Sequence, residues 1–344
     1  MRTSSASPSD PSHLQQPAGA DRPRRFDTRT KALRRFALSI TIFNIVGHLL
    51  LGFEQAYLTP VVGVLTGYAM ELLLETVSAR ATGRRARYLG GPTALVDFLL
   101  PAHIAGLACA MLLYGNESLW PTAFAVSVAV ASKYVVRIRI DGVLRHVLNP
   151  SNLGISVTLI LFTWVSIAPP YHFTANVYGF WDWAIPLGIG MAGTMLNGKL
   201  TRRMPLILGW VGGFVLQAVL RAVLFDASLP AALLPMAGVA FILFTNYMIT
   251  DPGTTPTTPR RQVLFGLATA LTYGALVLAH ITFGFFFALV IVCAVRGLLI
   301  VTRNRLTSRR GSATTPAAAD PVPATSTAPE SAAQRAEAPA GLIR

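Results

Sequence analysis

Long apolar runs separated by short polar segments occupy the chain from about residue 36 to residue 301. A helix needs about 20 apolar residues to cross the hydrocarbon core of a bilayer, and most of these runs approach that length. The pattern predicts an all-α fold, a polytopic bundle of about ten transmembrane helices, with nine or eleven as the alternatives. The predicted spans are 36–53, 57–78, 94–114, 119–136, 153–169, 181–197, 204–225, 230–249, 263–280 and 282–301.

The two ends of the chain differ from this middle part. The first 35 residues are basic and rich in Ser, Thr, Ala and Pro, and residues 302–344 are rich in Ala, Pro and Thr. Such segments bury too little apolar surface to offset the entropy lost on ordering. We therefore expect disordered tails at 1–35 and 302–344 around a membrane domain over 36–301, and no secretory signal at the start.

The distribution of charge agrees with a membrane topology. Charged residues make up 13% of the chain, well below the share usual in soluble domains, and the net charge is +14. Basic residues cluster in alternate polar segments, with Arg221 as the exception, and the intervening segments 114–120, 168–182 and 224–230 contain no Lys or Arg. Both termini are therefore predicted to be cytoplasmic in a multi-pass protein of the cell membrane. The charge fits a lipid bilayer with anionic headgroups as partner and argues against nucleic acid.

The third and eighth predicted spans share a pattern that would interrupt a helix. One contains FLLPAHIAG and the other ALLPMAG, so each has Leu-Leu-Pro followed by Ala-Gly. Proline and glycine break the hydrogen-bond ladder of a helix, and transporters use such breaks near the bilayer midplane. The two spans cross in opposite directions, which predicts an inverted repeat of five plus five spans. Chance similarity between apolar helices is the alternative.

Two polar segments between apolar runs are candidates for a binding site. The first, LRHVLNPSNLGI, contains Asn149, Pro150 and Asn152, and the second is YMITDPGTTPTTPRR. Aspartate at the C-terminal end of a helix is unfavourable for the helix dipole, so a compensating partner such as Arg260 or Arg261 is expected. Either the second segment is a turn that satisfies its own polar groups, or it is a polar floor for a ligand or cofactor. The candidate residues in it are Thr250, Asp251, Pro252, Thr254 and Thr255.

The segments HVLNPSNLGI and FILFTNYMITDPGTTPTTPRRQVLFG resemble signature segments of the flavin-carrying membrane subunits of two ion-motive redox complexes. The two complexes are Na⁺-translocating NADH:quinone reductase and the Rnf electron transport complex, and these subunits form the NqrB/RnfD-like superfamily. The resemblance extends to GPTALVDFLL, Lys133 and LTRRMPLILGWVGGF, and covers about residues 35–300. Within this superfamily the segment HVLNPSNLGI most resembles the corresponding segment of integral membrane proteins encoded beside enediyne polyketide biosynthesis genes. The resemblance implies electron transfer, with the eight candidate residues near a cofactor.

One departure from that family concerns the flavin. The family attaches FMN to the threonine of a Ser/Thr-Gly-Ala-Thr motif in the outer loop after the fifth span, whereas here Thr174 is followed by Ala-Asn. This difference argues against covalent FMN and leaves a noncovalent flavin or a quinone. A second departure replaces the family's Asp-Gly-Ser before the third span by Gly-Gly-Pro-Thr, with Asp97 at a position that is usually uncharged.

Ionisable residues inside predicted spans are hypotheses for function, because a charge in hydrocarbon is costly. The inward candidates are His48, Glu71, Asp97 and His103. Glu75, Lys133 and Arg221 are expected near helix ends, with their charged groups reaching the aqueous boundary. Cys109 and Cys293 are expected in the apolar core, without a disulfide or a metal.

Three hypotheses for function remain open from the sequence. The first is an electron-transfer subunit serving enediyne-type natural-product biosynthesis, within a membrane complex or with biosynthetic partner proteins. The second is a transporter or exporter of a small molecule or natural product, and the third is a membrane scaffold for biosynthetic enzymes. Direct catalysis is not expected, since the sequence has no Ser-His-Asp arrangement, cysteine cluster, Walker loop or dinucleotide fingerprint.

Overall fold

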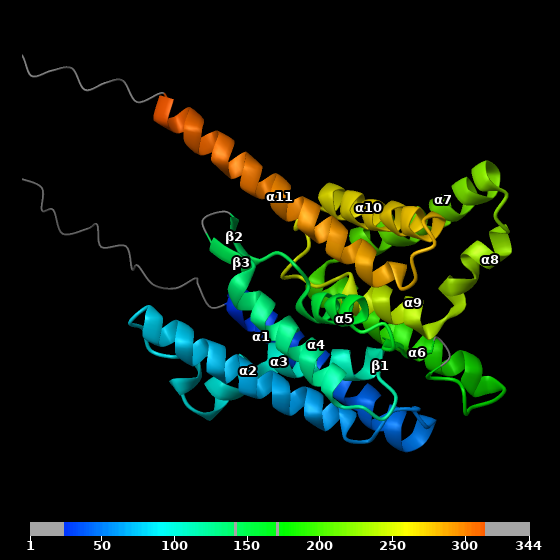
Figure 1. The fold of residues 1–344 in the computed structure, drawn as a ribbon, viewed down its shortest axis with the longest axis horizontal. Coiled ribbons are helices and arrows are strands. Elements are labelled where there is room, and N and C mark those ends of the chain that lie inside the picture. The colour runs from blue at the N-terminus through cyan, green and yellow to red at the C-terminus, as the bar shows by residue number, and fades with distance from the viewer. Residues whose placement is uncertain (1–23, 141–142, 170–171, 314–344) are drawn as a thin grey trace, which may run out of the picture. The chain divides into compact units, whose positions relative to one another are not determined.

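The computed structural model describes residues 24–140, 143–169 and 172–313, with side chains described between residues 30 and 306. These parts are mostly helical (Figure 1). The helices are α1 (Arg24–Val46), α2 (Thr59–Ala81), α3 (Pro92–Leu112), α4 (Trp120–Val135), α5 (Pro150–Leu161), α6 (Phe180–Leu196), α7 (Met204–Phe225), α8 (Leu229–Leu233), α9 (Val239–Leu243), α10 (Pro259–Leu278) and α11 (Gly284–Ala313). Contacts divide the chain into two units after Val301, and the description below concerns the first.

Each of the ten predicted spans coincides with helical structure, but fewer helices have the length of a span. Six are long and apolar enough to cross a bilayer: Thr30–Leu51, Thr59–Ala81, Pro92–Leu112, Met204–Phe225, Pro259–Leu278 and Gly284–Leu306. The pair Leu229–Ala237 and Val239–Met248, bent by 66°, makes a seventh if it counts as one span. Within the described residues, length and composition therefore support six or seven membrane-spanning helices.

The predicted spans that fall short do so for local reasons. Pro235 has no N–H to donate and Gly238 adopts an extended conformation, so the eighth predicted span breaks between α8 and α9. The fifth ends at Leu161 because the following chain forms β4 (Ser166–Ile167), which pairs with β1 (Leu113–Tyr114). Strand pairing satisfies backbone groups that a longer helix would otherwise have to satisfy.

After α4 the chain forms a hairpin that the hydrophobic pattern did not predict. Strand β2 (Arg137–Ile140) pairs antiparallel with β3 (Val143–His146), with Arg137 opposite His146. The alternating sequence RIRI followed by Asp-Gly is the signal that would have predicted it.

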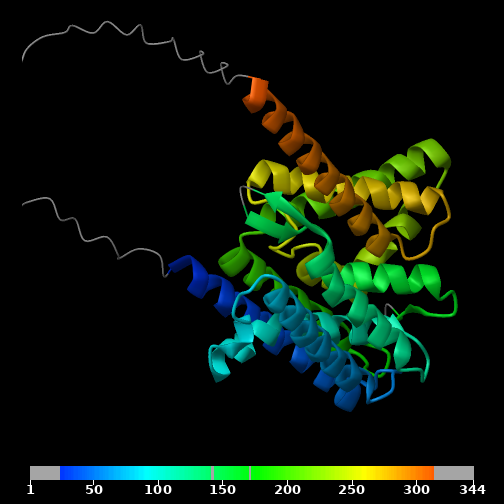
Figure 2. The same cartoon turned by 60° about the vertical axis from the view of Figure 1, so that its left-hand side comes forward.

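Glycines set the two closest helix pairs, α2 with α3 and α7 with α10 (Figures 1 and 2). A Cβ added to Gly63 of α2 would lie 2.7 Å from the Gly106 carbonyl oxygen of α3. In the second pair, a Cβ on Gly266 of α10 would lie 2.4 Å from the Leu206 carbonyl oxygen of α7. Without side chains at these points the backbones approach closely, which is the main source of van der Waals attraction between helices in lipid.

The outward faces of the helices carry large apolar side chains. On α7, for example, Leu208, Val223 and Leu224 are 66%, 73% and 66% exposed. Soluble monomers rarely expose continuous apolar surface of this kind, whereas lipid contact requires it. Together with the long apolar helices, this surface defines a helical membrane protein.

Helix α1 begins at Arg24 and α11 ends at Ala313. Both helices therefore extend beyond the predicted membrane domain of 36–301 into the segments predicted as tails. The remaining residues of those two tails, 1–23 and 314–344, lie outside the described residues. Cys109 and Cys293 are buried free thiols, in agreement with their predicted place in the core.

Candidate functional site

The two polar segments predicted as a site lie together in the structure. Asn149 caps α5, because its side-chain oxygen accepts a hydrogen bond from the Asn152 backbone N–H at 3.1 Å. Its amide Nδ2 donates to the Met248 carbonyl oxygen at 3.0 Å, across 99 residues of sequence. Asn152, fully buried, donates to the Phe286 carbonyl oxygen of α11 at 2.9 Å. The start of α5, including Pro150 at its first position, is thus tied to both the turn segment and α11.

The Thr-Asp-Pro turn satisfies much of its own polarity. The Asp251 carboxylate accepts hydrogen bonds from the Gly253 backbone N–H and the Thr254 hydroxyl, both at 3.0 Å. The Thr255 hydroxyl donates to the Asp251 carbonyl oxygen at 2.6 Å, and Pro252 has no N–H to satisfy. The Asp251 carboxylate is therefore compensated in part by hydrogen bonds within its own turn.

The prediction that Arg260 or Arg261 compensates Asp251 is wrong. Both arginines lie exposed in the first turn of α10, and the ion pairs among the described residues include neither. The start of α10 at Pro259 leaves both side chains exposed on its first turn. The arginines that contact the turn are Arg203, just before α7, and Arg296 of α11.

These two arginines bind main-chain oxygens of the turn. Arg203 donates from Nη1 to the Pro256 carbonyl oxygen and from Nη2 to the Pro252 carbonyl oxygen at 3.4 Å. Arg296 donates to the Thr254 carbonyl oxygen at 2.7 Å. The sequence analysis missed both residues, because Arg203 lies in the basic segment before span 204–225 and Arg296 in the last apolar run. Only the folded chain brings them to the turn.

The surroundings of the turn are strongly positive. Arg203 interacts electrostatically with both Asp251 and Arg296. Arg145 and Arg261 are close enough to interact electrostatically with Arg296. Arg203 is only 5% exposed, and its Nε has no hydrogen-bond partner among the described residues. Burial lowers the pKa of the Arg203 guanidinium, and the Asp251 carboxylate opposes that shift. One carboxylate among several cations leaves a net positive floor suited to an anionic group.

The segment before the turn is π-helical (Phe244–Met248), and polar side chains from elsewhere bind its backbone and side chains. Asn197 donates to the Asn246 carbonyl oxygen at 2.7 Å, and the Thr250 hydroxyl donates to the same oxygen at 2.7 Å. Trp210 donates from its indole nitrogen to the Thr245 hydroxyl at 2.9 Å. π-Helical turns recur at functional sites, and the sequence analysis did not predict this one.

A second polar region lies along α2 in the N-terminal half. Glu71 is buried, with Lys133 of α4 in contact with one carboxylate oxygen and the Tyr134 hydroxyl donating to the other at 3.0 Å. Lys133 was expected to reach the aqueous boundary, but its side chain is 11% exposed because the buried carboxylate binds it. A paired charge avoids most of the cost of an isolated one in hydrocarbon.

Glu75, one turn further along α2, is also paired rather than directed to water as predicted. Its side chain is fully buried and accepts hydrogen bonds from Arg87 Nη2 at 2.7 Å, from the Arg87 backbone N–H at 2.9 Å and from Arg84 Nη2 at 3.1 Å. The carboxylate raises the pKa of both arginines above their usual value. The loop after α2 therefore folds back to neutralise this helix.

The predicted inward residues of α3 contact different partners. Asp97 binds Arg34 of α1 with two hydrogen bonds of 2.7 and 2.9 Å. His103 lies 2.9 Å from the Thr41 hydroxyl through Nε2 and 2.9 Å from the Tyr68 hydroxyl through Nδ1. Thr41 donates its proton to a backbone carbonyl of α1, so His103 Nε2 carries the hydrogen of that contact. Pro101 between Asp97 and His103 does not bring the two together.

The loop before α6, where the subunits that this chain resembles carry FMN, packs against the segment that follows α1. The His172 ring lies 3.4 Å from the Phe53 ring, and Asn176 donates to the Leu51 carbonyl oxygen at 2.9 Å. Burial, with the nearby His48 as a smaller cause, lowers the pKa of His172 to about 4. Thr174 is half-buried in this loop, and its carbonyl oxygen accepts from the Val177 N–H at 3.3 Å.

Beyond this loop the chain is rich in exposed aromatic side chains. The exposed set is Tyr178, Phe180, Trp181 and Trp183. Aromatic residues concentrate at headgroup level, so this set is suited to a membrane interface.

A comparison with protein-family models and one with curated proteins find no match for this chain. The helices and their exposed apolar faces define the class, a helical membrane protein. The resemblance to redox subunits rests on the motifs alone.

Proposed function

We propose that this chain is a ten-span protein of the cell membrane, with both termini cytoplasmic and an inverted five-plus-five repeat, related to the membrane flavoprotein subunits of ion-motive redox complexes. We further propose that it serves enediyne-type natural-product biosynthesis through electron transfer, and that it holds a flavin or a quinone without a covalent bond. The observation that carries the proposal is the meeting of the Asn149 and Asp251 segments in one positive floor.

The residues of that floor fit the anionic part of a flavin nucleotide. Arg203, with its buried and unpartnered Nε, and Arg296 would supply the positive charge. The side-chain oxygen of Asn152, also buried and unpartnered among the described residues, is an acceptor for a ligand N–H or O–H. A flavin bound there would supply the electron-transfer chemistry. The protein groups would fix its charge and orientation.

The experiment is the absorption spectrum and intact mass of the purified full chain after gentle extraction. A flavin or quinone spectrum with the unmodified mass supports the proposal, and Arg203→Gln should reduce the bound amount. Arg80→Gln removes an exposed charge elsewhere and serves as the control. Colourless protein of unmodified mass, free of quinone on extraction, would contradict the proposal.

The topology can be tested independently. Because both native cysteines are buried, introduced cysteines can be labelled against a low background. Arg85→Cys and Arg202→Cys should react from one side of the membrane, and Glu117→Cys and Tyr178→Cys from the other. Labelling of Arg85→Cys and Arg202→Cys from opposite sides would refute the ten-span arrangement.

A transporter is the second candidate, favoured by the broken segment between Leu229 and Met248. Its two parts meet at 66°, and discontinuous helices are typical of substrate sites in secondary transporters. Flux of the pathway product into proteoliposomes would support this function. A flavin spectrum without flux would favour the redox proposal.

A further inference from the structure

Arg221 is the basic residue that does not fit the charge pattern. It lies near the C-terminal end of α7, at the opposite end of that helix from Arg202 and Arg203. It was expected to reach the aqueous boundary. Its side chain is partly buried, and its Nε is buried without a hydrogen-bond partner among the described residues.

The rest of the guanidinium is also poorly satisfied. Its one hydrogen bond within the described residues joins Nη1 to the Gln217 side-chain oxygen at 3.5 Å, which is a long and weak contact. Asp226 is five residues further on, where it caps α7 with a left-handed backbone, and it forms no ion pair with Arg221. Arg221 as a whole is only partly buried, and a guanidinium has five N–H donors, so most of its donors have no protein acceptor among the described residues.

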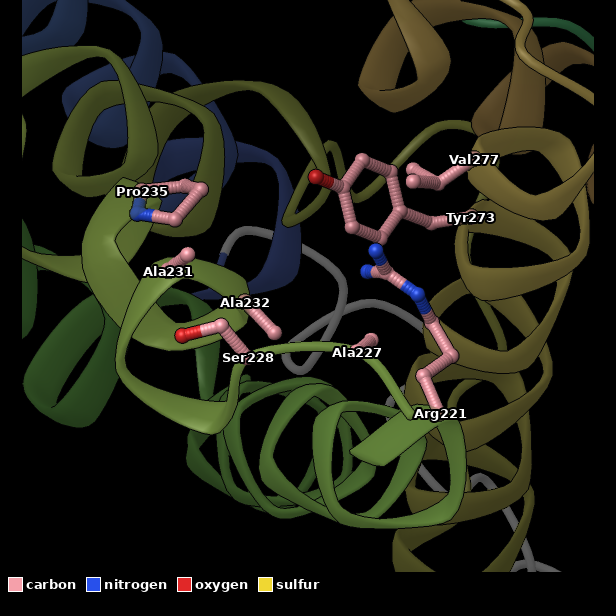
Figure 3. Close-up of a pocket in the computed structure, with 8 residues that line it drawn as sticks. All are labelled: Arg221, Ala227, Ser228, Ala231, Ala232, Pro235, Tyr273 and Val277. Carbon is pink, nitrogen blue, oxygen red and sulfur yellow. The ribbon is translucent and has the colours of Figure 1, made fainter. Parts of the chain in front are cut away.

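A cavity of about 210 Å³ adjoins this side chain, between α7, α8 and α10. Figure 3 shows the guanidinium extending from α7 towards Tyr273 of α10, with Ser228 and Ala231 on the facing side. The walls otherwise consist mainly of small apolar side chains. Arg221 thus supplies the only cationic group of the lining.

We propose that this cavity binds an oxyanion, a phosphate group, through Arg221. The planar guanidinium offers paired donors that match phosphate oxygens, and its two Nη groups can form such a pair. The volume is below the range of about 300–1,000 Å³ typical of drug-sized ligands, so it suits a small group. The phosphate of a lipid headgroup and free inorganic phosphate share this chemistry. The site is separate from the proposed cofactor floor and does not depend on it.

The experiment uses the full chain in nanodiscs and has two arms. In the first, discs of phosphatidylcholine with phosphatidylglycerol are re-extracted, and the phosphatidylglycerol retained by the protein is measured by mass spectrometry. In the second, discs of phosphatidylcholine alone are titrated with inorganic phosphate at constant ionic strength, and the shift in unfolding temperature is followed. Arg221→Gln should weaken the binding seen in one arm about tenfold, because it removes a charge-assisted bidentate contact.

Two further variants separate the site from general electrostatics. Arg80→Gln removes one exposed charge from α2 and should leave binding unchanged. Ala231→Phe fills the cavity while Arg221 is kept, and should weaken binding as Arg221→Gln does, even if the latter variant fails to fold. If Arg221→Gln loses binding in the first arm, the ligand is a lipid phosphate. If it loses binding in the second arm, the ligand is a free anion. Equal effects of Arg80→Gln and Arg221→Gln, or binding in neither arm, would overturn the proposal.

Discussion

Helices α2 and α7 use the same packing device but treat charge differently. In α2 a four-residue repeat places Gly63, Gly67, Glu71 and Glu75 on one buried face. In α7 the same spacing gives Gly209, Gly213, Gln217 and Arg221. In each, two glycines allow a neighbouring helix to approach, and polar groups follow on the same face.

The difference lies in the partners. Both carboxylates of α2 are bound, Glu71 by Lys133 and Tyr134, and Glu75 by Arg84 and Arg87. On α7 the guanidinium of Arg221 has only a distant amide oxygen among the described residues. On α2, other protein groups neutralise the charges of the close-packed helix face. On α7, the guanidinium of Arg221 keeps donors that can bind a ligand.

The largest expected effect concerns the Glu71–Lys133 pair. Lys133→Met leaves a buried carboxylate without its cation and should lower the free energy of unfolding by about 3 kcal/mol, as measured by thermal unfolding in detergent. The double variant Glu71→Leu with Lys133→Met removes both charges and should recover most of that loss. If the double variant is no more stable than the single one, the pairing is not what makes the charge on α2 tolerable.

The next effect tests the glycine faces themselves. Gly266→Ala places a methyl group 2.4 Å from a carbonyl oxygen of α7, and overpacking of this kind costs about 1–3 kcal/mol. Gly212→Ala is the matched control, because a Cβ there meets no atom within 4 Å. It should be neutral or slightly stabilising, since alanine favours a helix. Equal unfolding temperatures for the two variants would contradict close packing of α7 on α10.

A smaller loss of stability is expected at Asn149, which joins the start of α5 to the π-helical segment Phe244–Met248. Asn149→Ala removes both the cap of α5 and the hydrogen bond to Met248, and should cost about 1–2 kcal/mol. Asn149→Asp keeps the capping oxygen but loses the donor to Met248. If Asn149→Asp lowers the free energy of unfolding by less than Asn149→Ala does, in the same unfolding assay, the difference is the contribution of the helix cap. If the two variants lose the same free energy, the cap adds little to stability.

The smallest effect is a pH dependence at the loop before α6. The pKa of folded His172 is about 4, below the value of about 6.5 in an unfolded chain, so the folded state favours the neutral ring. Stability from this group is complete above about pH 6.5 and falls as the pH drops towards 4, by about 1 kcal/mol between pH 7.5 and 5.5. His172→Phe keeps a ring against Phe53 and should reduce this slope. An unchanged slope would assign the pH dependence to other groups.

Much of the helical structure could be predicted because apolar runs of span length have few alternatives in lipid. The predicted span 204–225 matches α7 residue for residue. The prediction was less accurate where strand pairing or an internal proline competed with the helix, as after Leu161 and at Pro235. Residue composition could not show these competing contacts, because their partners come from distant parts of the chain.

The sequence by itself determined that this is an apolar, helical chain, and it pointed to the Asn149 and Asp251 segments. Only the tertiary structure decided that these segments meet, that Arg203 and Arg296 rather than Arg260 and Arg261 bind the turn, and that Arg221 borders a cavity. The physical reason is range. Hydrophobicity and helix-breaking residues act locally and are visible in the sequence, whereas the pairing of buried charges and amides depends on which helices pack together.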